Sequence, residues 1–346
     1  MEELKRGRCD LMGKISNEST IEGIVRVKSS KSPIKFIVYF IIGLIILMLP
    51  FIYGSYITYI VSLVGVYYIV SLGLNILTGV AGQLSLGHSG FFAIGAYGTA
   101  ILTMKAGVPL LFSILISGVV SLLVGAIVGI PSLRVKGLYL AIVTLGLGVI
   151  VQKVLLEFTA LTEGAAGLLF ENIHFFGFNL SNETTVFYFI LAFCAVFTYL
   201  TYSLLNSHTG RALLTVRDNE IVASSLGISV KYYKILAFCI SGFYTAIAGG
   251  LYAVLVHHLS PEMFSINMSI TFLAMIIVGG LGSIGGSLIG TAFYVLLPEM
   301  LRNFKGLEEM IFGFFLLITI LFFPKGVWGI VQSIKRTKLF EKLSGN

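Results

Sequence analysis

The chain has 346 residues, of which 57% are hydrophobic and only 11% are charged. In soluble domains about a quarter of all residues are charged and cover the surface, so this composition excludes a soluble enzyme. The formal net charge of +7 favours contact with an anionic membrane surface over binding of nucleic acid. The sequence has no run of basic residues interleaved with aromatic residues that would indicate nucleic-acid binding.

The N-terminal segment, residues 1–33, is polar and of mixed charge. It lacks the apolar core and the small-residue cleavage site of a secretory signal peptide, so we interpret it as a cytoplasmic tail. The apolar run Ile34–Tyr53 follows. Its length is close to the ~20 residues that a membrane-spanning helix needs, and it is the first predicted span.

Further apolar runs follow, and we take each as a candidate span. They lie at about Tyr56–Leu77, Gly90–Met104, Pro109–Ile130, Leu138–Leu156, Thr185–Leu205, Lys234–His257 and Met310–Phe323. The stretch Met268–Leu301 is too long for one helix, and glycines interrupt it between residues 279 and 286, so it predicts two short or broken helices. The fold class expected is an all-α polytopic membrane protein, a bundle of about nine or ten transmembrane helices.

The distribution of Lys and Arg predicts the orientation, because loops rich in these residues stay in the cytoplasm. The loop 157–183 contains glutamates but neither Lys nor Arg, so we expect it outside. The loop 206–233, the turn at Arg134–Lys136 and the C-terminal tail 324–346 are basic and are expected inside. With both termini cytoplasmic the number of crossings is even, which favours ten over nine or makes one segment re-entrant. In the ten-span arrangement Arg302 and Lys305 would fall outside.

The segment Gly79–Gly90 is a poor lipid-facing helix, because four glycines interrupt it and four polar side chains accompany them. Non-helical backbone at membrane depth must be buried in protein or line a wet cavity. We therefore predict a translocation pathway at Gln83, Ser85, His88 and Ser89. Close packing between glycine-rich helices is an equally good alternative. For His88 alone, a hydrogen-bonded structural histidine is the preferred interpretation.

The stretch His208–Ile228 has apolar residues near helical spacing, with Arg211, Arg217, Asp218 and Glu220 beside them. This pattern is typical of a short amphipathic helix on a membrane surface. It also fits a helix that docks into the groove of a soluble partner. From the residues alone, the solvated surface helix is the simpler interpretation.

The sequence predicts no catalytic, cofactor-binding or metal-binding residues. Gly280–Gly285 matches the dinucleotide fingerprint in letters, but it joins two apolar runs instead of following a strand in a soluble βαβ unit. No phosphate-binding P-loop is present, so we expect that this chain does not bind or hydrolyse ATP by itself. The three cysteines have no spacing that indicates a disulfide or a metal site.

Five stretches together carry a resemblance that covers roughly residues 35–330. They are Gly73–His88, Ser132–Leu145, Gly210–Ile228, Val278–Ser283 and Phe323–Gly326. On these residues the chain resembles the permeases of bacterial ABC importers for branched-chain amino acids, most closely the LivM-type subunit. The outer-loop stretch Thr162–Gly167 departs from the family pattern, which has more glycine and polar residues there.

The resemblance implies a permease domain over residues 34–323, with the loop 206–233 fitting a cleft in an ATPase subunit. The residues that match the coupling motif or flank it are Arg211, Arg217, Asp218, Asn219, Glu220, Ala223 and Gly227. It further implies two ATPase subunits, a paralogous LivH-type permease and an extracytoplasmic substrate-binding protein, in a bacterial plasma (inner) membrane. Membrane lipid would surround the bundle, and no cofactor is expected in this chain.

Two alternatives stay open. An importer of the same superfamily could carry another small polar solute, such as urea, short amides or a sugar, and nothing in the pathway segment separates these. A passive channel or an ion-coupled carrier would need no ATPase. It predicts more ionisable residues inside the membrane than this chain has, and it leaves the loop 206–233 unexplained.

Overall fold

The computed structural model describes residues 48–52, 54–170, 174–175, 178–179 and 182–301, together with residues 311, 313–314, 317, 326 and 328–329. The chain divides into two compact units, residues 1–49 and 50–346, and nearly all the described residues belong to the second. The tail 1–33, most of the first and last predicted spans, most of the tail 324–346, Arg302 and Lys305 lie outside the described residues.

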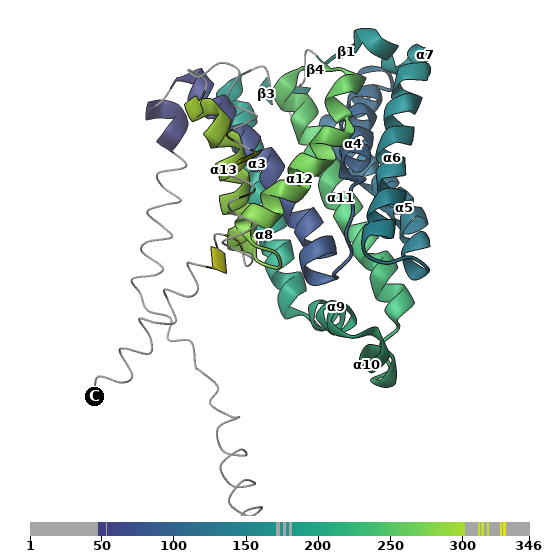
Figure 1. The fold of residues 1–346 in the computed structure, drawn as a ribbon. Coiled ribbons are helices and arrows are strands. Elements are labelled where there is room, and N and C mark those ends of the chain that lie inside the picture. The colour runs from purple at the N-terminus through teal and green to yellow at the C-terminus, as the bar shows by residue number, and fades with distance from the viewer. Residues whose placement is uncertain are drawn as a thin grey trace, which may run out of the picture. The chain divides into compact units, whose positions relative to one another are not determined.

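The second unit is a bundle of α-helices (Figure 1). Its longer helices are α3 (Ser55–Asn75), α4 (His88–Met104), α5 (Leu110–Gly129), α6 (Leu138–Glu157), α8 (Glu183–Asn206), α11 (Val230–Val256), α12 (Ile266–Gly279) and α13 (Ile284–Leu301). Its short elements are the helices η2 (Ile76–Val80), η3 (Pro131–Leu133), α7 (Thr159–Thr162), η4 (Gly164–Ala166), α9 (His208–Asp218), α10 (Glu220–Ser225) and η5 (Pro261–Phe264), and the strands β1 (Leu168–Leu169), β2 (His174–Phe175), β3 (Phe178–Asn179) and β4 (His258–Leu259).

The helix boundaries follow the apolar runs of the sequence. Within the described residues, six helices are long and apolar enough to cross a membrane, and α12 is a shorter apolar helix. The prediction of an all-α polytopic membrane protein is confirmed. The stretch Met268–Leu301 does form two helices, because the backbone at Gly280 and Gly282 takes positive φ angles of 121° and 78° that continue neither helix.

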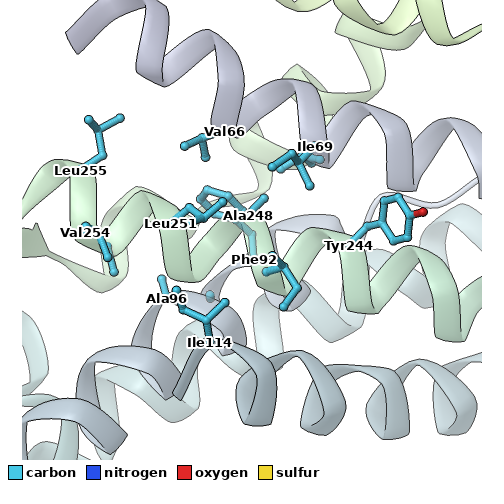
Figure 2. Packing of buried hydrophobic residues seen from close by; sticks show 14 of the residues in the cluster. Val66, Ile69, Phe92, Ala96, Ile114, Tyr244, Ala248, Leu251, Val254 and Leu255 are labelled. Atoms are coloured by element: carbon cyan, nitrogen blue, oxygen red, sulfur yellow. The ribbon is translucent and has the colours of Figure 1, made fainter. Parts of the chain in front are cut away.

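Helix α11 lies at the centre of the bundle and packs against α3, α4 and α5 (Figures 1 and 2). Ala248, Leu251 and Val254 on α11 are fully buried, and they meet side chains such as Ile69 of α3 and Phe92 of α4. This aliphatic and aromatic cluster forms the core of the unit.

The backbones of α4 and α11 approach very closely. A Cβ atom at Gly249 would collide with the carbonyl oxygen of Phe92, and one at Gly95 would collide with that of Ala246. Small residues at such crossings let membrane helices pack through their backbones. Helices α4 and α11 therefore form a tightly joined pair.

The connections gather at two ends of the unit (Figure 1). One end, here the α10 end, carries α9, α10 and the turn 131–137, and an ion pair between Lys136 and Glu220 joins them. At the other end, here the β1–β4 end, Leu168 and Leu169 pair antiparallel with β4. Among the described residues, the turn at Arg134–Lys136 and the loop 206–233 thus share one end, and the described part of the acidic loop 157–183 lies at the other.

Candidate functional site

The predicted pathway segment is a break between two helices. The π-helix η2 ends at Val80, residues 81–87 form no regular helix, and α4 begins at His88. Gly82 adopts a φ of 69°, which favours glycine, and the backbone nitrogen of Gln83 donates to the Leu77 carbonyl oxygen at 3.0 Å. We call this seven-residue segment the 81–87 break.

Three of the four predicted pathway residues are hydrogen-bonded in two separate buried groups. The His88 ring contacts the Ser85 hydroxyl at 3.1 Å through Nδ1 and the Ser241 hydroxyl of α11 at 2.7 Å through Nε2. The Ser89 hydroxyl accepts from the Ser269 hydroxyl of α12 at 2.8 Å. His88 is fully buried, so it has the surroundings of the structural histidine that the sequence favoured.

Gln83 differs from its three neighbours. Its side chain is buried, with 4% of its surface exposed, yet neither its Nε2 nor its Oε1 has a hydrogen-bond partner among the described residues. Native proteins pair most buried polar groups. The unpaired amide therefore marks Gln83 as the exceptional residue of the 81–87 break.

The predicted coupling residues lie on α9 and α10 at the α10 end. Arg211 is exposed, whereas Ala223 is fully buried. Asn219 separates the two helices and caps α10, because its side chain accepts from the backbone nitrogens of Ile221 and Val222. Gly227 has a φ of 77° and ends the helix, as glycine commonly does. Several coupling positions therefore shape the segment as well as being available to a partner.

Glu220 fastens α10 to the bundle through two ion pairs. Its Oε1 lies 2.8 Å from the Lys234 ammonium of α11 and 2.9 Å from that of Lys136. Lys234 is buried, with 5% of its surface exposed. Partial burial raises the pKa of the Glu220 carboxyl, but Lys234 and Lys136 outweigh it and hold the pKa below its ordinary value of 4.5. The carboxylate is therefore ionised at neutral pH.

Arg217 connects the coupling residues to the 81–87 break. Its Nη1 donates to the Gly79 carbonyl oxygen at 2.7 Å, while its Nε and Nη2 donate to the Asp218 carboxylate at 3.1 Å. The side chain also packs against Gly82, where a Cβ atom would collide with the Cγ of Arg217. Two segments that the sequence assigned to different functions thus contact each other directly.

The sequence interpretation missed two groups of residues in this region. The first group is Lys136 and Lys234, the partners of Glu220. From the sequence, Lys136 was only part of a basic turn that indicated orientation, and Lys234 was only the first residue of a predicted span. Ile221, Val222 and Leu226 are large apolar side chains of α10 and its end that point to solvent, with 78%, 49% and 69% of their surfaces exposed. Their position among the predicted coupling residues Glu220, Ala223 and Gly227 is the sequence signal that could have revealed them.

Comparison with known proteins adds the family. Residues 56–324 match the family model described as "Branched-chain amino acid transport system / permease component". The chain belongs to this family. The prediction of a transport permease, and not an enzyme, is confirmed by that membership. Among the described residues, no group of three potential metal-ligating side chains lies together.

Individual relatives agree with the family. The chain is 32% identical to the high-affinity branched-chain amino acid transport system permease protein LivM of Escherichia coli, over 83% of this chain and 74% of that one. The LivM protein of Salmonella typhimurium is 33% identical over 76% and 67% of the two chains. The LivH permease of E. coli is 23% identical over 78% and 93%. No solved structure gives a significant match.

Proposed function

We propose that this chain forms one half of the translocation pathway of an ABC importer for branched-chain amino acids, with the α9–α10 segment receiving movement from an ATPase. The observation that carries this proposal is the contact of Arg217 with Gly79. Together with the packing of Arg217 on Gly82, it connects the predicted coupling segment to η2 and to the 81–87 break without an intervening side chain.

The assembly follows from the family. Its other half is a paralogous LivH-type permease, and two ATPase subunits and an extracytoplasmic binding protein complete it. The domains are a cytoplasmic tail 1–33, a permease domain 34–323 with the coupling loop 206–233, and a cytoplasmic tail 324–346. The α10 end faces the cytoplasm, and the β1–β4 end faces the binding protein, in a bacterial inner membrane.

The mechanism uses the ion pairs of Glu220 and the Arg217 bond as two separate connections. Movement of α10 by the ATPase pulls on Lys234 at the start of α11, while movement of α9 pulls on Gly79. Nucleotide binding supplies the bias between two states that differ by roughly a few kcal/mol. The shift reopens the region around Gln83, Ser85, His88 and Ser89, and the amino acid passes.

The exposed apolar side chains of α10 supply the ATPase contact in this proposal. A charge at a buried apolar contact disfavours association, so Ile221→Asp should prevent the ATPase subunits from co-purifying with the permease pair. Leu169→Asp is the matched control, because Leu169 is also exposed and apolar but lies in β1 at the opposite end. Equal retention of the ATPase by both variants would refute docking at α10.

The identity of the solute needs a separate measurement. In proteoliposomes supplied with the binding protein, leucine, isoleucine or valine should stimulate ATP hydrolysis, and urea, short amides and sugars should not. Stimulation by one of those other solutes alone would replace the proposed substrate.

Cysteines at Ser85 and Ser89 should react with small thiol reagents in at least one nucleotide state, whereas protection in every state would favour the helix-packing interpretation.

A further inference from the structure

A polar cavity lies at the α10 end, between the 81–87 break, the turn 131–137 and the helices α9, α10 and α11. Its volume is about 210 Å³, below the range of about 300–1,000 Å³ that accommodates drug-sized ligands. The polar side chains that line it include Gln83, Lys136, Arg217, Glu220 and Lys234. The size of the cavity restricts any occupant to a small solute.

The lining combines three cations with one carboxylate. Both ion pairs of Glu220 use Oε1, and each ammonium has three donors, so the two lysines keep donor capacity beyond their bonds to Glu220. Lys234 also donates to the Ser132 carbonyl oxygen, at a long 3.4 Å. A cavity of this kind attracts a carboxylate and offers one negative charge to a nearby ammonium.

Gln83 provides the second, independent observation. Its amide has a donor and an acceptor, and both are buried without a partner among the described residues. A buried polar group left unpaired is unfavourable, and it becomes favourable when a ligand supplies the missing bond. Gln83 also lines the cavity, so a rotation of its side chain toward the cavity would let the amide serve the negative and the positive group of one small solute at the same time.

We propose that this cavity binds one free α-amino acid at the α10 end. The carboxylate of the solute is held by the lysine ammoniums and by Nε2 of Gln83, and its ammonium by Glu220 and Oε1 of Gln83. The choice of an amino acid, among zwitterions of this size, rests on the proposed function. The occupant would contact the 81–87 break and α10 together. It would therefore lie against Arg217 and Glu220, the two residues through which the ATPase is proposed to act.

The test measures equilibrium binding of radiolabelled leucine to the purified permease and ATPase complex in nanodiscs, without nucleotide and without binding protein. We expect leucine to bind saturably. Leucinol, which lacks the carboxylate, and 4-methylpentanoate, which lacks the ammonium, should compete with it at least tenfold more weakly than unlabelled leucine does. Gln83→Met should also weaken leucine binding at least tenfold. Unchanged binding by Gln83→Met, or equal competition by chloride or phosphate, would overturn the site.

A matched control is Gln152→Met. Gln152 lies on α6, toward the end of that helix away from the cavity-lining Leu140, and its amide donates to the Pro261 carbonyl oxygen at 3.2 Å. This variant should bind leucine like the wild type, which separates the loss of one particular amide from a general effect of the substitution.

Failure of this inference is distinguishable from failure of the proposed function. Leucine uptake by the complete importer together with no leucine binding in the nanodisc assay would remove the cavity site and leave the function. Leucine binding that Gln83→Met abolishes, in a complex that takes up no branched-chain amino acid, would remove the function and leave the site.

Discussion

Two helix breaks lie against each other in this bundle, and they treat their buried polar groups in opposite ways. The turn between α12 and α13 is bonded by Asn75 of α3, which accepts from the Gly282 nitrogen at 2.6 Å and donates to the Ser283 carbonyl oxygen and the Ser287 hydroxyl at 3.0 and 2.8 Å. The 81–87 break carries Gln83, whose amide has no partner among the described residues.

The two breaks adjoin where Gly79, just before the 81–87 break, meets Gly282, with no space for a Cβ atom on Gly79. Asn75 and Gln83 are buried to the same degree, each with 4% of its surface exposed, so burial alone does not explain the difference. A break in which one amide bonds the turn from three sides is held in a single conformation. A break with an unpaired amide keeps bonding capacity for a second conformation or for a ligand. The first break is thus held by its own hydrogen bonds, and we propose that the second is the functional break.

The largest effect is expected in the structural break. Asn75→Ala removes three hydrogen bonds and leaves buried backbone groups unpaired, which should lower the free energy of unfolding by about 2–4 kcal/mol. Thermal unfolding of the purified protein in detergent measures the change. Asn206→Ala is the control, since the exposed Asn206 amide donates to Tyr202 within its own helix. Equal stability of both variants would contradict a structural role for Asn75.

A smaller effect is expected where the coupling segment meets the functional break. Arg217→Ala removes the bond to the Gly79 carbonyl oxygen, worth about 1.5 kcal/mol for a charged donor. Solute transported per ATP hydrolysed should fall about tenfold, while ATPase subunits remain bound. In Thr215→Ala the lost bond is a local one, from the Thr215 hydroxyl to the Arg211 carbonyl oxygen within α9, and this variant should stay coupled. Identical coupling ratios would argue against the Arg217 connection.

The functional break itself should tolerate substitution in the resting protein. Gln83→Met replaces an amide without a partner among the described residues by an apolar side chain of similar length. We expect the unfolding temperature to stay unchanged or to rise. The free energy of unfolding should increase by at most about 1 kcal/mol, a change opposite in sign to that of Asn75→Ala. A marked loss of stability would mean that Gln83 is bonded in the same way as Asn75, and the contrast between the breaks would disappear.

The smallest effect concerns pH. The folded pKa of Glu220 is depressed below 4.5, so its ion pairs contribute stability above the ordinary pKa, and this contribution is lost as pH falls through the folded pKa. The difference in unfolding temperature between the wild type and Glu220→Gln should stay constant from about pH 8 to about pH 5 and shrink only below about pH 4.5. A decline near neutral pH would contradict the depressed pKa.

The sequence predicted the spans well because a helix that crosses a membrane needs a long run of apolar residues, and such a run can be recognised from the local sequence alone. The predicted run Leu138–Leu156 differs from α6 by a single residue. Glycine chemistry likewise predicted the interruption between α12 and α13. Both signals need no knowledge of distant parts of the chain.

The contacts of the candidate site could not be predicted in the same way. Glu220 and Lys234 are brought together only by the turn of α10 against α11, and Arg217 reaches Gly79 across 138 positions. Asn75 and Gln83 are both amides in apolar surroundings, and no local pattern says which one finds partners. Their difference depends on packing between helices, which pairwise spacing does not encode.

Helix α11 has a mechanical consequence. Its 27 residues extend about 40 Å, with Lys234 held by Glu220 near one end and β4, paired to β1, directly beyond the other. The absence of space for a methyl group between it and α4 makes the pair resist bending. We expect α11 to behave as a stiff rod, so that a displacement at the α10 end arrives almost undiminished at the opposite end, without relay from one side chain to the next.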